Sequence, residues 1–320
     1  MVSLGDIRAA HDRIRAHIHR TPVFTSRAID ELLGANVAFK CESFQRGGSF
    51  KIRGALNAVL TLDDREAARG VATHSSGNHG AALAIAAGVR GIPAYIVVPA
   101  NAPRVKRAAI EGYGGIVTEC AATVPAREAA LAEVVERTGA HFVPPYDDAR
   151  IVAGQGTATV ELMEQAPDLE QIWVPVGGGG LTAGAAVAAH GIDPRVKVIA
   201  AEPSRADDAF RSIANGRIEP MRNPATIADG LRTPLGQLNF DILRSHDVTV
   251  ELASEAAIIA ATRLMFERMK LVVEPSGAVP LAALLEASPS RRARRIGVIV
   301  SGGNVDLEAL LEILKNPGGY

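Results

Sequence analysis

The heptad Ser49-Phe50-Lys51-Ile52-Arg53-Gly54-Ala55 is the stretch from which the rest of this chain is best understood. Its lysine is one of only six, which stand at positions 40, 51, 106, 197, 270 and 315. Apolar neighbours on both sides of Lys51 reduce its solvation, which lowers the pKa of the amine and frees it for attack on a carbonyl. The heptad therefore favours a Schiff-base lysine. The alternative is a surface lysine that buries only its stem.

Composition and charge limit the possible classes of protein. A chain of 320 residues is long enough for one large domain or two of ordinary size. Its 48% hydrophobic but only 4% aromatic content suits helices packed on a buried parallel sheet. The formal net charge of -1, without long single-sign runs, makes nucleic acid or an anionic membrane a poor partner.

The sequence has no pattern typical of a membrane span, a signal peptide or a disulfide framework. No uninterrupted apolar run is long enough to span a bilayer, and the N-terminus lacks the apolar core of a signal peptide. Cys41 and Cys120 have no metal-ligand spacing and form no disulfide framework. We therefore expect a cytoplasmic protein with two free thiols.

Short strands alternate with helices along most of the chain. Between residues 71 and 143 the pattern predicts strands at 71–74, 94–98, 116–119 and 141–143 and helices at 81–88, 104–112 and 127–138. Elsewhere it predicts strands at 36–42, 171–176, 196–201 and 296–300 and helices at 4–19, 49–62, 156–165, 181–190, 254–269, 277–286 and 307–315. Residues 203–247, rich in Pro, Asn, Gly and Asp, are predicted to be irregular. The alternation is typical of parallel βαβ units. We expect an α/β fold with a large domain, 1–69 and 148–320, and a small mobile domain, 70–147.

Four consecutive glycines, Gly177, Gly178, Gly179 and Gly180, separate a predicted strand from a predicted helix. Glycines there let the backbone approach an anion, and the helix N-terminus turns N–H groups and partial positive charge toward it. The Walker lysine and the Rossmann spacing are both absent, so a small phosphate monoester fits better than a nucleotide. A tight turn without a ligand is the alternative.

Two further turns follow predicted strands. Ser75-Ser76-Gly77-Asn78-His79-Gly80 is rich in short donors that suit a carboxylate, with a cluster of N-caps as the alternative. Ser301-Gly302-Gly303-Asn304 repeats the arrangement at the end of the last strand. A buried cofactor would explain all three turns together.

Together these motifs resemble the pyridoxal-phosphate enzymes of fold type II, specifically the serine/threonine dehydratase and serine racemase family. The matching segments run in family order over almost the whole chain: 49–55, 75–80, 177–180, 201–203, 228–230 and 301–304. The resemblance implies a tryptophan-synthase-β-like fold, in which two open, mostly parallel twisted sheets are flanked by helices. It also implies a homodimer that acts on a small amino-acid substrate.

The resemblance assigns a set of cofactor contacts. Lys51 would form the Schiff base with pyridoxal 5'-phosphate, and Phe50 would pack against the pyridine ring. Asn78 would bond the ring hydroxyl and Ser301 would face the pyridine nitrogen. The remaining contacts would come from the glycine bend and from two flanking positions, Leu181 and Gly230.

A serine hydroxyl at the ring nitrogen indicates the reaction type. It cannot keep that nitrogen protonated as a carboxylate would, so the ring is a weaker electron sink and prompt loss of a β-leaving group is favoured. We therefore expect dehydration of serine, threonine or 3-hydroxyaspartate to a 2-oxo acid and ammonia, with Lys51 removing the α-proton. The expected substrate contacts are Ser75, Ser76, Asn78, His79 and Arg127.

Ser76 opens an alternative, since many threonine dehydratases have alanine there and racemase-like members have serine. A hydroxyl opposite Lys51 can return a proton from the second face, which would make the protein an amino-acid racemase. The alternative to this catalytic role is that the Ser76 hydroxyl only bonds the backbone of its own turn. Rivals with other chemistry are a β-replacement enzyme of the cysteine-synthase type and a non-catalytic phosphate-ligand binding module.

Two more features concern metal and specificity. Glu202, Ala206 and Asp208 match the divalent-cation loop of the racemase-like members, and two carboxylates with a backbone carbonyl suit structural Mg²⁺, Ca²⁺ or Mn²⁺. A solvated acidic loop is the alternative. Arg127 and the pair Arg232-Thr233 are candidates for binding a substrate side chain, because arginine binds a carboxylate with two parallel hydrogen bonds.

Overall fold

The computed structural model describes residues 2–75, 77–102 and 104–315, and its strands form two sheets. The larger sheet has six strands in the order β1-β2-β10-β7-β8-β9, of which only β1 runs antiparallel to its neighbour. Their bounds are β1 (Val23–Phe24), β2 (Asn36–Cys41), β7 (Gln171–Pro175), β8 (Lys197–Pro203), β9 (Thr249–Ala253) and β10 (Arg295–Val300).

The smaller sheet has four parallel strands in the order β5-β4-β3-β6. They are β3 (Val71–His74), β4 (Ala94–Pro99), β5 (Ile116–Cys120) and β6 (His141–Phe142). The predicted fold class, two mostly parallel sheets flanked by helices, is therefore confirmed.

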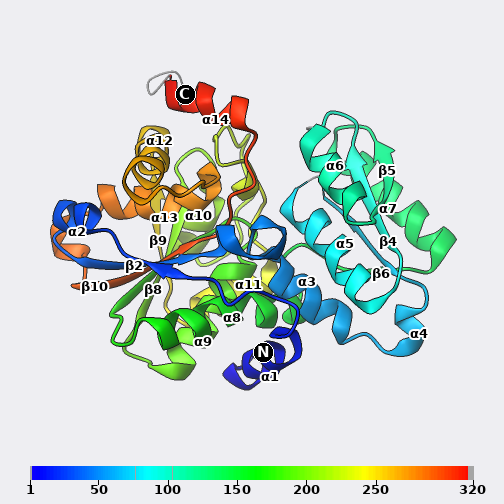
Figure 1. Cartoon of the computed structure of the whole chain (residues 1–320), viewed down its shortest axis with the longest axis horizontal. Helices are drawn as coiled ribbons and strands as arrows, with labels where there is room; N and C mark the ends of the chain where they lie inside the picture. The colour runs from blue at the N-terminus through cyan, green and yellow to red at the C-terminus, as the bar shows by residue number, and fades with distance from the viewer. Residues whose placement is uncertain (1, 76, 103, 316–320) are drawn as a thin grey trace.

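Helices cover both faces of the larger sheet (Figure 1). On one face lie α8 (Ala149–Gln165), α9 (Gly180–Ile192) and α11 (Gln237–Ser245), with α1 (Leu4–Ile14) outside them. The other face carries α2 (Arg27–Leu33), α12 (Glu255–Leu264), α13 (Pro275–Glu286) and α14 (Leu307–Lys315). The helix α10 (Asp208–Asn215) lies beside β9 and packs with the α9 and α11 side, because Ala209 belongs to the same hydrophobic cluster as those helices. No helix in the described ranges is long and apolar enough to cross a membrane.

The smaller sheet lies in the part of the molecule drawn mainly in cyan, to which α3 leads (Figure 1). Its helices are α3 (Lys51–Leu60), α4 (Asp64–Ala67), α5 (Asn78–Arg90), α6 (Arg104–Gly112) and α7 (Val124–Thr138). Short 3-10 helices occur at Glu42–Phe44, Arg46–Gly48, Asp229–Leu231 and Pro289–Arg291, and a π-helical turn, Met265–Met269, extends α12.

The side chains of the larger sheet alternate between two hydrophobic cores, as the period of a strand requires. On β7, Trp173 packs with α12 and α13, whereas Ile172 and Val174 pack with α9 and α11. On β10, Val298 and Ile299 are divided in the same way. Both faces are apolar because both are covered by helices.

Several predicted boundaries were wrong. The segment predicted as irregular, 203–247, contains α10 and α11, while α1 ends at Ile14 and α8 begins at Ala149. The strands β1 and β9 and the helix α2 were not predicted at all. The buried face of α10 consists of Asp208, Ala209 and Ser212. The helix has only eight residues, and the surrounding Pro, Asn, Gly and Asp residues led to the prediction of an irregular segment.

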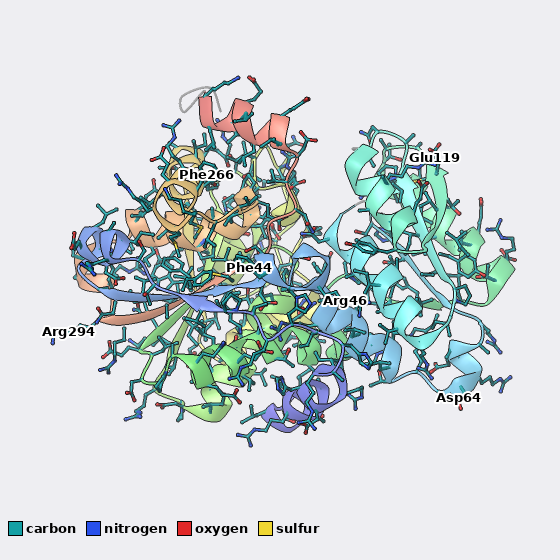
Figure 2. The ribbon with its side chains drawn as sticks, in the orientation of Figure 1. Phe44, Arg46, Asp64, Glu119, Phe266 and Arg294 are labelled. Atoms are coloured by element: carbon teal, nitrogen blue, oxygen red, sulfur yellow. The ribbon has the colours of Figure 1, made fainter. Side chains whose placement is uncertain are left out.

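The domain boundaries at 69/70 and 147/148 stay a prediction. Figure 2 labels Asp64 and Glu119 in the part with the smaller sheet, and Phe266 and Arg294 in the part with the larger one. Within the smaller-sheet part, two side-chain pairs join α4 to α5 and β6: Asp64 with Arg90 at 3.4 Å and Glu66 with His141 at 3.5 Å.

A buried ion cluster joins β2, α3 and α8. Arg53 donates to Glu42 at 2.7 Å and to Glu161 at 2.8 Å, and Lys40 donates to Glu161 at 2.6 Å. All four side chains are at most 1% exposed. Lys40 also donates to Thr21 O at 2.8 Å. A missing charge in so buried a cluster would leave its partner uncompensated, so the cluster fixes the position of α3 two residues beyond Lys51.

Glu161→Gln should lower the free energy of unfolding by about 3–5 kcal/mol, because it leaves two buried cations facing one carboxylate. The matched control is Glu164→Gln on the same helix, since Glu164 is half exposed and pairs only with Arg20. The control should cost less than about 1 kcal/mol. Urea titrations that gave equal losses for both variants would contradict this account of the cluster.

Candidate active site

Lys51 is the first residue of α3 and is partly buried. Its Nζ donates to Pro145 O at 2.9 Å and lies 5.1 Å from the centre of the Phe50 ring. Burial lowers the pKa of the amine to about 8, while the negative charge of Glu274 acts in the opposite direction. A much larger fraction of this amine is therefore neutral near physiological pH than in an ordinary lysine, as a nucleophile requires.

The turn after β10 packs directly on the segment that precedes Lys51. Phe50 N–H donates to Ser301 O at 3.0 Å, and Gly303 N–H donates to Gly48 O at 2.9 Å. A single β-bridge joins Ser49 to Gly302. The structure thus brings Ser301, only 3% exposed, beside Phe50 and close to Lys51.

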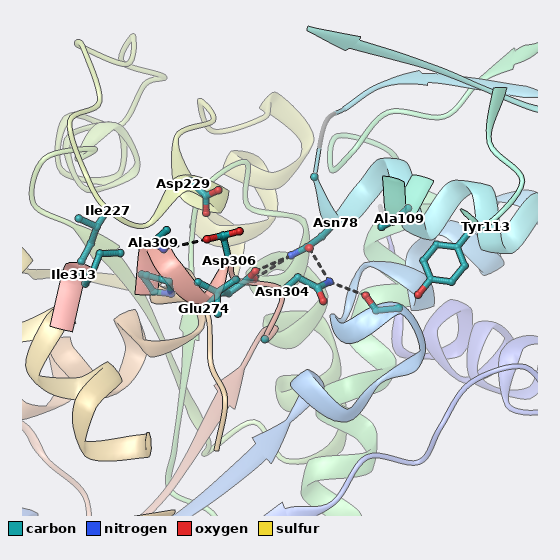
Figure 3. A pocket seen from close by; sticks show the side chains of 16 residues that line it. Asn78, Ala109, Tyr113, Ile227, Asp229, Glu274, Asn304, Asp306, Ala309 and Ile313 are labelled. Carbon is teal, nitrogen blue, oxygen red and sulfur yellow. Dashed lines mark hydrogen bonds between the residues drawn. The ribbon is translucent and has the colours of Figure 1, made fainter. Parts of the chain in front are cut away.

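Asn78, the first residue of α5, is held by side chains from two other segments. Its Nδ2 donates to both oxygens of Glu274, at 3.0 and 3.2 Å, and its Oδ1 accepts from Asn304 Nδ2 at 3.0 Å. These three side chains line a pocket that Tyr113 and Asp229 also border (Figure 3). Asn78 therefore stands where the two sheet-bearing parts and the 301–304 turn meet.

The four glycines form a bend between β7 and α9. A Cβ on Gly178 would lie 2.3 Å from the Tyr146 ring, and Gly179 has a φ of +92°, so both positions favour glycine. The first hydrogen bond of α9 runs from Ala183 N–H to Gly179 O. The three N–H groups before Ala183 consequently have no acceptor within the helix and are available to an anion.

Two further predicted cofactor residues lie near this bend. Leu181 is 4% exposed and belongs to the same hydrophobic cluster as Phe50. Gly230 N–H donates to Ser276 Oγ at 3.0 Å, and the next residue, Leu231, has its Cα 3.1 Å from the place of a Cβ on Gly177. Leu181 therefore packs in the core beside the bend, and Gly230 precedes a residue that lies against it; their contact with the cofactor stays a prediction.

His79 is 2% exposed and lies in the electrostatic field of Lys51. Burial, followed by the Lys51 charge, lowers the pKa of the imidazole to about 3, so the ring is neutral. Its Nε2 lies 3.0 Å from Val143 O and must be the donor there. The Nδ1 atom is left as a buried acceptor without a partner among the described residues.

The other residues predicted to bind the substrate differ in their surroundings. Ser75 Oγ accepts from Gly77 N–H at 3.3 Å within the turn, and Ser76 lies outside the described residues. Arg127, on α7, lies near His74, and its buried Nε has no partner in the described part of the chain. Arg232 instead donates from Nε to Thr226 O at 2.8 Å.

Glu202, near the end of β8, and Asp208, the first residue of α10, are buried carboxylates. Glu202 accepts from Ala209 N–H and Phe210 N–H, both at 2.8 Å, and burial raises its pKa to about 9. Asp208 accepts from Leu235 N–H at 2.8 Å, and burial raises its pKa to about 6. Asp208 Oδ1 is buried without a partner among the described residues.

The loop carries three carboxylates, Glu202, Asp207 and Asp208, of which Asp207 pairs with Arg211 at 2.9 Å. Within the described ranges, no group of three or more His, Cys, Asp or Glu side chains is arranged to hold a metal ion. The predicted set needs only two carboxylates, because its third ligand is the Ala206 carbonyl oxygen. Both cysteines are free.

Sequence reasoning missed two residues of this site, Tyr146 and Glu274. Tyr146 packs on the glycine bend, and Glu274 binds Asn78 and influences Lys51. The only local signal for Tyr146 is its place after Pro144-Pro145, where the predicted small domain ends. Glu274 precedes Pro275 at the start of α13, and a carboxylate there is equally consistent with a helix N-terminus.

Comparisons with known proteins agree with this geometry. The family model described as "Pyridoxal-phosphate dependent enzyme" matches residues 14–302, so the chain belongs to that family. Serine racemase from Dictyostelium discoideum is 48% identical over 318 residues, which are 98% of both chains. The beta-hydroxyaspartate dehydratase of Paracoccus denitrificans (strain Pd 1222) is 48% identical over 305 residues, 95% of this chain and 97% of that protein.

Solved structures show the same relationship. The crystal structure of serine racemase from Dictyostelium discoideum has a TM-score of 0.92 and 48% identity, covering 96% of this chain and 99% of that one. The crystal structure of T.th. threonine deaminase has a TM-score of 0.89 and 43% identity, covering 95% of this chain and 99% of that one. The family resemblance predicted from the motifs is confirmed, and pyridoxal phosphate is the cofactor of this family.

The lowered pKa of Lys51 predicts its chemical reactivity. In cofactor-free protein, the rate of acylation of Lys51 should rise with pH around a midpoint of about 8, since only the neutral amine reacts. The acylation rate of an N-acetyl-lysine amide in the same reaction should rise with a midpoint at pH ~10.4. Peptide mass spectrometry after brief acylation measures both rates, and coincident midpoints would show that Lys51 is not desolvated.

Proposed function

We propose that this protein dehydrates a β-hydroxy amino acid to a 2-oxo acid and ammonia. The observation that carries the proposal is the desolvated Lys51 amine, placed where the 47–50 and 301–304 turns meet. Lys51 would bind the cofactor through a Schiff base and, once displaced by the substrate amine, take the α-proton. The β-hydroxyl would leave as water with that proton, and addition of one water to the remaining enamine would release the 2-oxo acid and ammonia.

The residues of the site fit pyridoxal 5'-phosphate. The bend at Gly177–Gly180 has free N–H groups for a phosphate, and Leu181, Gly230 and Phe50 lie around it. When bound, the cofactor withdraws electrons from the substrate Cα. The chain itself would hold the phosphate at the bend, with Asn78 at the ring hydroxyl and Ser301 at the ring nitrogen.

Arg127 supports a substrate with an acidic side chain, such as 3-hydroxyaspartate. Its Nε is buried and has no partner among the described residues, although a buried guanidinium donor normally binds an acceptor. A substrate carboxylate would supply one. The neutral His79 offers a buried acceptor, Nδ1, for a substrate donor, and Ser75 and Asn78 would complete the substrate contacts. The similar dehydratase from Paracoccus denitrificans acts, by its name, on beta-hydroxyaspartate.

Racemisation is a second candidate activity at the same site. Relatives named serine racemase are as similar to this chain as the dehydratase is. The reaction needs a proton donor on the face opposite Lys51, and Ser76 would fill that role. Formation of D-serine from L-serine in deuterated water, with label at Cα, would demonstrate it. Absence of labelled D-serine would exclude it.

A substrate panel read as ammonia and 2-oxo acid tests the dehydratase proposal. Lys51→Ala should lower the rate by at least about 10²- to 10⁴-fold, because both the Schiff base and the α-proton base are lost. Arg127→Gln should lower kcat/KM for 3-hydroxyaspartate by about 10- to 100-fold, corresponding to a lost charge-assisted hydrogen bond. The same variant should leave serine turnover unchanged.

The matched control for this panel is Arg137→Gln, since Arg137 is exposed on the same helix. It should leave every substrate unaffected. Equal losses on serine and 3-hydroxyaspartate in Arg127→Gln would remove Arg127 from the substrate site. Failure of the wild-type protein to release ammonia from any β-hydroxy amino acid would overturn the dehydratase proposal.

We also propose a structural divalent cation held by Glu202, the Ala206 carbonyl and Asp208. Two buried carboxylates with raised pKa values and an unpartnered Asp208 oxygen are costly without a compensating charge. Mg²⁺, Ca²⁺ or Mn²⁺ would supply it, completed by water. Because Asp208 also accepts from Leu235 N–H, the ion would steady the segment that lies under the glycine bend.

Removal of the ion should therefore destabilise the protein. Mg²⁺ at about one hundred times its dissociation constant should stabilise the fold by about 2.7 kcal/mol relative to chelator, seen as a higher Tm. Asp208→Asn should abolish this difference, yet its amide oxygen can still accept from Leu235 N–H. The control Asp207→Asn should retain it, because Asp207 pairs with Arg211. A Tm that no divalent ion changes would disprove the site.

The predicted homodimer and cytoplasmic location stay proposals. Apolar side chains are exposed around the packed helices α12 and α14, including Phe266 at 49% and Leu307 at 68%. Exposed apolar groups of this kind often mark an interface between subunits. Light scattering of the purified protein tests this, and the mass of a single chain at micromolar concentration would refute the dimer.

A further inference from the structure

Asn239, on the first turn of α11, lies directly beneath the glycine bend. Its side chain is fully buried, and its Nδ2 donates to Gly178 O at 2.7 Å and to Tyr146 O at 3.3 Å. Gly236 N–H donates to the same Gly178 oxygen at 3.1 Å. Asn239 Cβ is 2.8 Å from the place where a Cβ on Gly179 would lie. No other side chain in the described residues donates to the carbonyl of Gly178.

The contact to Gly178 O also determines the direction of an N–H group. In a trans peptide the C=O of one residue and the N–H of the next point to opposite sides of the chain. Since α11 holds the Gly178 oxygen on its own side, the Gly179 N–H points away from α11. The peptide between Gly178 and Gly179 therefore directs its carbonyl acceptor toward α11 and its N–H donor away from α11.

The glycines alone do not determine this orientation. Residues on both sides of the peptide lack a Cβ, so the peptide can rotate with little steric resistance. After such a rotation the carbonyl oxygen would face the anion, and the contact would become repulsive. A bend of four glycines therefore needs an external contact that selects one orientation of its peptides.

We propose that Asn239 is a positioning residue that holds the Gly178–Gly179 peptide with its N–H directed to the cofactor phosphate. This inference rests on the proposed placement of the phosphate at the glycine bend. Asn239 would not touch the phosphate itself. Its amide would act by preventing the Gly178 carbonyl from turning toward the anion.

The unpartnered oxygen of Asn239 supports a donor role for this side chain. Asn239 Oδ1 is buried and has no partner among the described residues. A flipped amide would place this oxygen against the carbonyl oxygens of Gly178 and Tyr146, which is repulsive, so the orientation of the amide is determined. Burial of an unsatisfied oxygen is unfavourable. The two hydrogen bonds that Asn239 Nδ2 donates compensate for the cost of burying Oδ1.

Binding of pyridoxal 5'-phosphate and of pyridoxal to the cofactor-free chain tests this role. Both ligands form the same bond with Lys51, so the ratio of their dissociation constants measures the contribution of the phosphate. Asn239→Leu keeps the approximate volume and removes the donor. It should raise the dissociation constant of pyridoxal phosphate about tenfold, corresponding to one lost hydrogen bond, and leave that of pyridoxal unchanged.

Two other variants complete the experiment. Asn239→Asp keeps the shape of the side chain and replaces the donor with a carboxylate, so it should show the same phosphate-specific loss if the leucine variant does not fold. Gln237→Glu is the control for charge at the start of α11, because Gln237 is exposed and bonds only Asp241. The control should bind both ligands as the wild type does.

The outcomes separate this inference from the proposed function. Unchanged binding of pyridoxal phosphate in both Asn239 variants, or an equal loss for both ligands, overturns the positioning role alone. If the wild-type chain binds pyridoxal as tightly as pyridoxal phosphate, the phosphate does not rest on the bend. In that case the proposed placement fails, and the role of Asn239 fails with it.

Discussion

The ion cluster of Lys40, Glu42, Arg53 and Glu161 is the constraint on which the rest of the site depends. Arg53, on α3, donates to Glu42, which follows β2 directly, and to Glu161 on α8, so three segments are joined at one buried point. Burying four charges is favourable only when their geometry and hydrogen bonds are complete. Because Arg53 stands two residues after Lys51, this requirement also positions the nucleophile. A displacement of α3 that moved the amine would also disrupt the cluster.

The proposed cofactor site follows the same principle, mainly with backbone and amide groups. The 301–304 turn is bonded to the 47–50 segment through the backbone, and Asn78 is held by Glu274 and Asn304. Under the glycine bend, α11 supplies Asn239 and Gly236 to the same carbonyl oxygen. Flexible glycines are thus surrounded by rigid partners. The backbone can approach a ligand closely, and its orientation is still determined.

Burial supplies the chemistry as well as the stability. Desolvation lowers the pKa of Lys51 and of His79 and raises that of Glu202 and of Asp208. The first two groups become a nucleophilic amine and a neutral imidazole, while the last two become a pair of carboxylates that a cation would relieve. Asp208 and the bend are linked through Leu235, so the proposed ion and the proposed phosphate share a short segment of chain.

The sequence by itself determined the features that depend on neighbouring residues. The apolar flanks of Lys51, the glycine run after a strand and the alternation of strands and helices are all local patterns, and they were enough for the fold class and the family. Tertiary structure alone decided the contacts of Arg53 with Glu161, of Asn239 with Gly178 and of Asn78 with Glu274. These partners are separated by 108, 61 and 196 positions, respectively. The short helix α10 also became visible only in the fold. The physical reason is that periodicity and turn chemistry record the preferences of adjacent residues, whereas a buried polar contact exists only after distant elements have packed and excluded water.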